Sequence, residues 1–268
     1  MFDHSWNLLT QAEKQVFRKL SVYKGGFTRF AAEKVAGATL VILSSLVEKS
    51  FIRRAGLDRF ELHELLRKYA HDKLCQHPEE HEAALDSHCE YFTDLLYSIE
   101  SRLLGSGQFE ALEEISGEYK NILAAVQWAA DNMKFIELNK SNLALWYFCE
   151  TRTRFEDALQ LGNQSASSLQ SIESGNRDNP DFCRAYAWSF LFLGYGYIWQ
   201  GQYKIANENL EKGLAVAEVS GDDFMTAMML NYLGLNKVFQ RDNSAREYLK
   251  RGNAITDDID LIWLKRFL

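Results

Sequence analysis

The sequence predicts a mainly α-helical protein with one small β-hairpin near its N-terminus. Only two prolines occur in 268 residues, Pro78 and Pro180, so long helices are rarely interrupted. Helix-favouring alanine, leucine, glutamate and glutamine are abundant. Two similar segments near the C-terminus are typical of stacked helical repeats. The hydrophobic fraction of 47% is enough to bury a core.

The first 76 residues predict three helices, a hairpin and a fourth helix. Thr10 and Glu13 form a capping box that begins the first helix, and Gly25-Gly26 is expected to end it. Apolar residues alternate in two short runs separated by the turn 55–58. This order matches a winged-helix domain, which we place at 1–76. The expected elements are helices beginning at Thr10, Thr28 and Thr39, strands at 51–54 and 59–62, and a helix from His63 or Glu64 to Cys75.

Beyond Pro78 the chain is expected to be helical throughout. Residues 77–135 are predicted to form a helical linker, and 136–268 to form helical repeats. Gly105-Ser106-Gly107 breaks the first long amphipathic stretch. The expected helices cover 79–104, 108–116, 118–132, 138–149 and 155–170.

Two segments repeat each other at a spacing of 40 residues. LFLGYGYIWQGQYKIANENL (191–210) and NYLGLNKVFQRDNSAREYL (231–249) align on Leu193-Gly194 and Leu233-Gly234. The small residue Gly194 suits a place where paired helices touch. The first copy resembles the tetratricopeptide repeat, and the second departs from it by carrying Lys237 in place of a tyrosine. Because repeats need neighbours, we expect a degenerate copy at 138–170 and the start of another at 255–268, giving an incomplete tetratricopeptide-like superhelix.

Several segments together resemble one family. They are LSVYKGGFTRFAAEKVAG, LSSLVEKSFI, FELHELLRKYAHDKL and EYKNILAAVQWAADN. In this order they are similar to the winged-helix and linker segments of STAND signalling ATPases, in the bacterial regulators that carry tetratricopeptide arrays. The resemblance covers most of residues 6–252. It implies the C-terminal part of a signal-transduction switch and transcriptional regulator.

The resemblance assigns a role to His63. In that family a Met-His-Asp motif places a histidine on the β-phosphate of bound ADP, and Leu62, His63 and Glu64 stand at the matching positions here. A helix N-terminus favours an anion, and an imidazole there adds a directed donor. His63 is thus the candidate nucleotide-sensing residue. From the residues alone, His63 could equally cap the helix or pack at the surface.

No G-x-x-x-x-G-K-[ST] segment occurs in the chain. We therefore expect no ATPase activity from it, no catalytic residues, and no cofactor of its own. ADP or ATP is expected only with a separate nucleotide-binding domain, in cis or in trans. The chain is expected to be the C-terminal part of a longer protein, or a piece cut from one.

The repeat region is the expected recognition surface. The resemblance places Trp188, Tyr195 and Trp199 along the concave groove, where they would anchor an inducer or a partner protein. A helix that is apolar all round also fits complete burial between repeats, and this alternative remains open.

Charge and composition bear on two alternative functions, DNA binding and a plain adaptor. Residues 1–75 carry 13 Lys/Arg against 8 Asp/Glu, whereas 76–268 carry 17 against 29. DNA binding is the alternative for the basic segment, with Arg53, Arg54 and Arg59 on the hairpin. Specific DNA binding is not expected, because the third helix lacks arginine, asparagine and glutamine to read bases. A plain adaptor with a structural winged helix is the other alternative.

Two further expectations concern metals and location. His71, Cys75, His77, His81, His88 and Cys89 lie within 19 residues. Pro78 separates the two i,i+4 pairs and the spacing fits no zinc motif, so we expect no metal. Four widely spaced cysteines and the lack of an apolar run of ~20 residues predict a cytoplasmic protein that does not enter the membrane.

Overall fold

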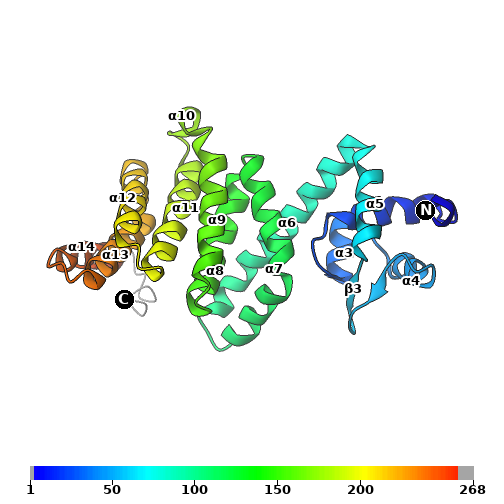
Figure 1. Cartoon of the computed structure of the whole chain (residues 1–268), viewed down its shortest axis with the longest axis horizontal. Helices are drawn as coiled ribbons and strands as arrows, with labels where there is room; N and C mark the ends of the chain where they lie inside the picture. Colours follow the sequence, from blue (N-terminus) through cyan, green and yellow to red (C-terminus); the bar gives the residue numbers. More distant parts are fainter. Residues whose placement is uncertain (1–2, 259–268) are drawn as a thin grey trace. The chain divides into compact units, whose positions relative to one another are not determined.

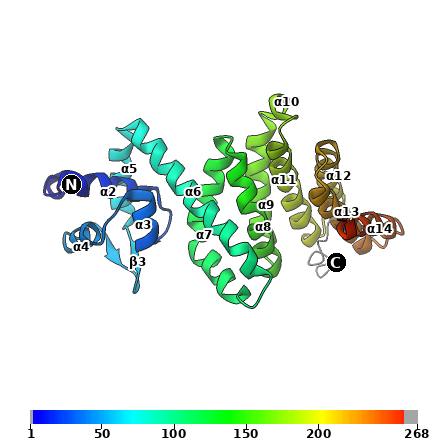
Figure 2. The ribbon, with the colours of Figure 1, turned by 180° about the vertical axis from the view of Figure 1, so that it is seen from behind.

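The computed structural model describes residues 3–258 and is mainly α-helical (Figures 1 and 2). Its packing divides the chain into two compact units. The N-terminal unit comprises residues 3–95 and 113–128, and the helical-repeat unit comprises residues 96–112 and 129–258. Two long helices, α6 (Pro78–Leu103) and α7 (Gln108–Asp131), contribute to both units. The predicted fold class is confirmed, and the division at 76 and 135 stays a prediction.

The N-terminal unit has the element order of a winged helix. Its elements are α1 (Asp3–Asn7), α2 (Gln11–Lys19), the 3₁₀ turn η1 (Leu20–Val22), β1 (Phe27–Thr28), α3 (Arg29–Ala36), α4 (Leu40–Glu48), β2 (Arg53–Arg54), β3 (Arg59–Glu61) and α5 (Glu64–Cys75). The strands form one antiparallel sheet in the order β1–β3–β2, and Phe60 pairs with Phe27 on one side and Arg54 on the other. The predicted hairpin is confirmed. The sequence does not predict strand β1, because two residues are too few to show the alternation of apolar and polar side chains typical of a strand.

Threonines begin α2, α3 and α4 as predicted. In the capping box, the Glu13 backbone N–H donates to Thr10 Oγ1 (3.3 Å) and the Thr10 N–H donates to Glu13 Oε2 (2.7 Å). Thr28 and Thr39 each accept a backbone N–H from three residues ahead. The first helix ends earlier than expected, at Lys19, because the chain tightens into η1 before reaching the Gly25-Gly26 pair.

Glu13 also joins α2 to α4. Lys49 Nζ donates to both of its carboxylate oxygens at 2.8 Å, and Ser45 Oγ donates to Oε1. Burial opposes ionisation of Glu13, but the hydrogen bonds from Lys49, Ser45 and Thr10 outweigh it and lower its pKa to about 2. The carboxylate therefore stays charged inside the interface.

The core of the N-terminal unit is built from large apolar side chains on α2, η1, α4, α5 and the sheet. Each is less than 5% exposed: Phe17, Leu20, Phe27, Leu43, Leu46, Phe60 and Leu74. The first half of α6 closes this core with His88 and Phe92, whose rings lie 4.7 Å apart. Burial lowers the pKa of His88 to about 3, so this ring is neutral in the folded chain.

The helical-repeat unit is a succession of helices packed against their sequence neighbours. It contains the end of α6, parts of α7, and α8 (Phe135–Thr151), α9 (Phe155–Gln170), α10 (Glu173–Asn176), α11 (Pro180–Trp199), α12 (Tyr203–Ser220), α13 (Asp223–Phe239) and α14 (Ala245–Asp258). The helices expected at 108–116 and 118–132 form the single helix α7, because Gly117 adopts helical geometry without breaking it. The further repeat expected at 255–268 falls largely outside the described residues.

Small residues bring the paired helices close, as the repeat predicts. A Cβ on Gly194 of α11 would meet Leu210 Cδ2 of α12 at 2.4 Å, and a Cβ on Gly234 of α13 would meet Leu249 Cδ2 of α14 at 2.6 Å. No real Cβ sits that close to another atom, so glycine is required for these side chains to pack as they do. The two copies therefore use the same contact.

Within residues 3–258, no single helix is both long and apolar enough to cross a membrane. The short helices α3 and α4 meet the criteria of length and composition only when taken together, and they are bent by 106°.

Candidate functional site

His63 lies between β3 and α5 and is the N-cap of α5. Its Nδ1 accepts the backbone N–H of Leu65 at 3.3 Å. In the neutral ring the proton is then carried by Nε2, because Nδ1 supplies its lone pair to the backbone. The residue is exposed. The capping role considered from the residues is thus present, and Nε2–H is the remaining donor of the neutral ring.

A hollow of about 260 Å³ lies beside His63. Its polar lining comes from Arg53, Arg54, Ser50 and His63, and its apolar lining includes Phe51 and Leu66. The backbone N–H groups at the start of α5 and the guanidinium group of Arg54 favour an anion here. The carboxylate of Glu64 is held by Arg67 at 2.7 Å, which also lowers the Glu64 pKa.

The arginines of the hairpin are engaged within the chain. Arg59 forms an ion pair with Glu118 of α7 and donates to the Gly26 and Gly117 carbonyls at 3.0 and 3.1 Å. Arg53 forms an ion pair with Glu61. The Arg54 guanidinium lies 6.0 Å from the Phe60 ring centre. The positive charges of Arg53 and Arg59 are therefore already balanced by carboxylates within the chain.

The exposed start of α4 is apolar. Leu40 and Val41 are 50% and 79% exposed, and the preceding Thr39 uses its hydroxyl to cap the helix. In a winged helix this third helix is the element that would enter a DNA groove. Apolar side chains there can contact a thymine methyl group but cannot read the donor and acceptor pattern of base edges.

The three aromatic residues predicted to bind a partner lie at different depths. Trp188 and Tyr195 are 3% and 1% exposed, whereas Trp199 is 49% exposed. The Tyr195 hydroxyl donates to the Cys149 carbonyl at 3.1 Å. The Trp199 ring lies 6.4 Å from Tyr195 and 6.0 Å from Phe239. Trp199 is thus the member of the set that a partner could reach without movement of the helices.

A buried polar network lies next to these rings and is not predicted by the sequence. Trp146 Nε1 donates to the Tyr232 hydroxyl, and that hydroxyl donates to Glu150 Oε1, both at 3.0 Å. Burial raises the pKa of Glu150 to about 7, although the hydrogen bond from Tyr232 opposes this. The network joins α8 to α13, which are far apart in sequence, so no local pattern reveals it.

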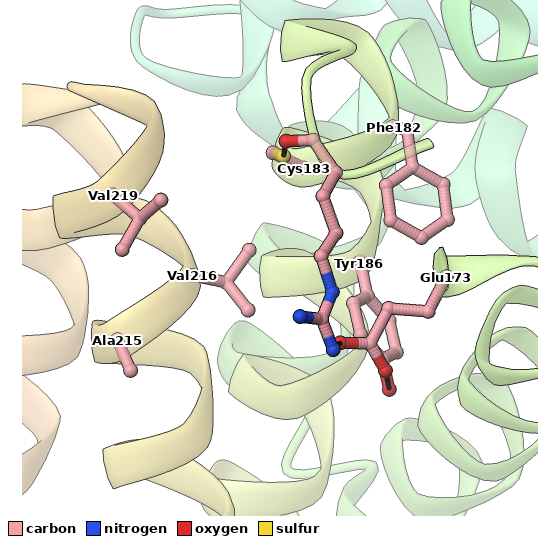
Figure 3. A pocket seen from close by; sticks show the side chains of 8 residues that line it. Glu173, Phe182, Cys183, Tyr186, Ala215, Val216 and Val219 are labelled. Atoms are coloured by element: carbon pink, nitrogen blue, oxygen red, sulfur yellow. Dashed lines mark hydrogen bonds and ion pairs between the residues drawn. The ribbon is translucent and has the colours of Figure 1, made fainter. Parts of the chain in front are cut away.

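A pocket of about 310 Å³ opens between α11 and α12 (Figure 3). Phe182, Cys183 and Tyr186 of α11 face Ala215, Val216 and Val219 of α12 across it. Its charged edge is the ion pair of Arg177 with Glu173 at 3.0 Å. An apolar floor with one charged edge suits a peptide side chain or a small apolar molecule. No motif in the sequence predicts it.

The chain is similar in sequence to proteins that are named as regulators. No family model matches the chain. It is 30% identical over 158 residues to proteins named "Putative HTH-type transcriptional regulator" from Mycobacterium tuberculosis (Rv0890c and MT0914) and Mycobacterium bovis (Mb0914c). The match covers 54% of this chain and 18% of each relative, so the chain spans about a fifth of their length.

A solved structure from Pyrococcus horikoshii also aligns with the chain. It is a signal transduction ATPase with numerous domains (STAND) that carries a tetratricopeptide repeat sensor. The alignment covers 97% of this chain and 46% of that protein, with 13% identity and a TM-score of 0.34.

Proposed function

We propose that this chain is the regulatory part of a STAND-type switch in the cytoplasm. The winged helix docks on a nucleotide-binding domain, in cis or in trans, and His63 contacts a phosphate of the nucleotide held there. The helical repeats bind an inducer or a partner protein. The observation that carries this proposal is the exposed His63 at the start of α5, with Nδ1 engaged by the Leu65 N–H.

Three physical features support the phosphate contact. The ring of His63 keeps Nε2–H as its donor, the first turn of α5 carries partial positive charge, and Arg54 lines the same hollow. The hollow is open, so an anion presented by another domain could enter it.

The repeat surface supports the second half of the proposal. Trp199 offers an exposed aromatic ring backed by Phe239, and large aromatic rings are common anchors of protein interfaces. Trp188 and Tyr195 stay in the proposed partner site as residues whose contact with a partner needs the helices to open. The pocket between α11 and α12 is a second place for an inducer.

DNA binding is the second candidate function, favoured by the names of the mycobacterial relatives. The ion pairs of Arg53 and Arg59 and the apolar start of α4 speak against it. A gel shift at ~150 mM salt with competitor DNA separates the two, because contacts to phosphate alone weaken steeply with salt. A sequence-specific complex that survives these conditions would favour DNA binding.

The switch is tested by complex formation with a P-loop nucleotide-binding domain from the same cells. We expect the two to co-purify in the presence of ADP, and His63→Ala to weaken the complex. His77→Ala is the matched control, because His77 is also exposed but lies at the other end of α5. Co-purification that is equal for both variants would leave the plain adaptor as the better description.

A further inference from the structure

His71, Cys75 and His81 meet in the N-terminal unit, although the sequence separates them by a proline. His71 and Cys75 are one turn apart on α5, and His81 is in the first turn of α6. The Pro78 junction turns the chain so that the two helix faces oppose each other. One nitrogen of each imidazole and the Cys75 Sγ all lie within 4.8 Å of one another.

The spacing of these atoms suits a tetrahedral metal ion. His71 Nε2 and Cys75 Sγ are 3.6 Å apart. A zinc ion with Zn–N of ~2.05 Å and Zn–S of ~2.3 Å holds its nitrogen and sulfur ligands about 3.6 Å apart. The rings of His71 and His81 have their centres 5.3 Å apart.

Two ring nitrogens at the cluster are buried without a hydrogen bond. Neither His71 Nδ1 nor His81 Nε2 has a partner among residues 3–258. A buried polar atom normally has one, because the water it leaves must be replaced. His71 Nε2 is the atom beside Cys75 Sγ, so the unpartnered His71 Nδ1 would be left for a second hydrogen bond, whereas the unpartnered His81 Nε2 is an atom that a bound ion could satisfy.

We propose that His71, Cys75 and His81 bind a divalent transition-metal ion, with zinc favoured. Nitrogen and sulfur ligands select zinc over magnesium and calcium, which prefer oxygen. On binding, the Cys75 thiol loses its proton to solvent and the thiolate bonds to the metal. Cys75 is exposed, so water occupies the fourth position. The ion fastens the end of α5 to the start of α6 and needs no nucleotide-binding partner.

Cobalt substitution tests this site on the intact, tag-free chain. We expect one equivalent of Co²⁺ to produce the visible bands of a tetrahedral ion together with a thiolate-to-cobalt charge-transfer band, and Zn²⁺ to displace it. Absence of both band types from the wild-type chain would overturn the proposal without any variant. A band set that Mg²⁺ removes as readily as Zn²⁺ would also overturn it.

Variants then identify the ligands. Cys75→Ser should abolish the charge-transfer band, and His81→Asn should weaken cobalt binding at least tenfold. His77→Asn is the matched control and should bind as the wild type does, because His77 lies in the same junction but outside the cluster. Circular dichroism of each variant confirms that it folds. Unchanged cobalt spectra in folded Cys75→Ser and His81→Asn would assign the metal to other residues.

Discussion

The buried carboxyl of Glu150 makes the stability of the helical-repeat unit depend on pH. Burial raises its pKa from 4.5 to about 7, so the folded chain holds this proton more tightly than the unfolded chain does. The stabilisation of the folded chain by the protonated Glu150 carboxyl is complete below pH 4.5, and it is lost as the pH rises through 7. Each pKa unit corresponds to about 1.4 kcal/mol. Allowing for the partial exposure of the residue, the loss amounts to about 1–3 kcal/mol.

The Glu150→Gln variant removes the charge and keeps an oxygen that accepts from Tyr232. We expect it to be more stable than the wild type by about 1–3 kcal/mol at pH 8, and to show no gain at pH 4.5. Urea unfolding followed by far-ultraviolet circular dichroism at both pH values measures the difference. His88, with its lowered pKa, contributes the opposite slope, but it is the same in both chains and cancels.

Glu156→Gln is the matched control, because Glu156 is exposed on α9. Its effect should stay within ~0.5 kcal/mol at either pH. A Glu150→Gln chain that is no more stable than the wild type at pH 8 would refute the reasoning. A gain of equal size at pH 4.5 and pH 8 would do the same, because it would not come from ionisation.

Three further predictions concern the fold and the partner surface. Gly194→Ala should destabilise the chain by about 1–3 kcal/mol because the added methyl group has no room, whereas Gly175→Ala, which meets no atom within 4 Å, should not, as thermal unfolding can test. Glu13→Gln should cost about 1–3 kcal/mol by weakening the capping box and the contact with Lys49, and an unchanged urea midpoint would contradict this. Trp199→Ala should reduce capture of the protein partner at least tenfold without loss of helicity, and equal capture would exclude Trp199 as an anchor.

Local chemistry explains which parts of the fold could be predicted. Threonine caps and the turn at 55–58 act within a few residues, and the glycines of the repeat are marked by the repeat itself, so the sequence alone reveals them. The strand β1 exists because Phe27 pairs with Phe60, and the first helix ends early because of a local 3₁₀ turn. The pairing of Phe27 with Phe60 joins segments far apart in the sequence, so no local residue pattern encodes it.

The candidate sites likewise include features that the sequence predicts and features that it does not. The position of His63 at a helix start follows from its place after a short strand, and the structure confirms that it is exposed. The burial of Trp188 and Tyr195 could not be predicted, because a helix that is apolar all round does not tell which side its neighbours cover. The cluster of His71 with His81 was missed because Pro78 was expected to hold the two apart, whereas it turns the chain and brings them together.

The contact of His63 with a nucleotide phosphate is tested most directly by comparing ADP with AMP, which lacks the β-phosphate. Binding of each nucleotide is measured by calorimetry on the chain in complex with the nucleotide-binding domain proposed as its partner. We predict that His63→Ala weakens ADP binding about tenfold or more, since a hydrogen bond to a charged group contributes ~1.5–3 kcal/mol, and leaves AMP binding unchanged. Equal affinities of wild type and His63→Ala for ADP would contradict the phosphate contact.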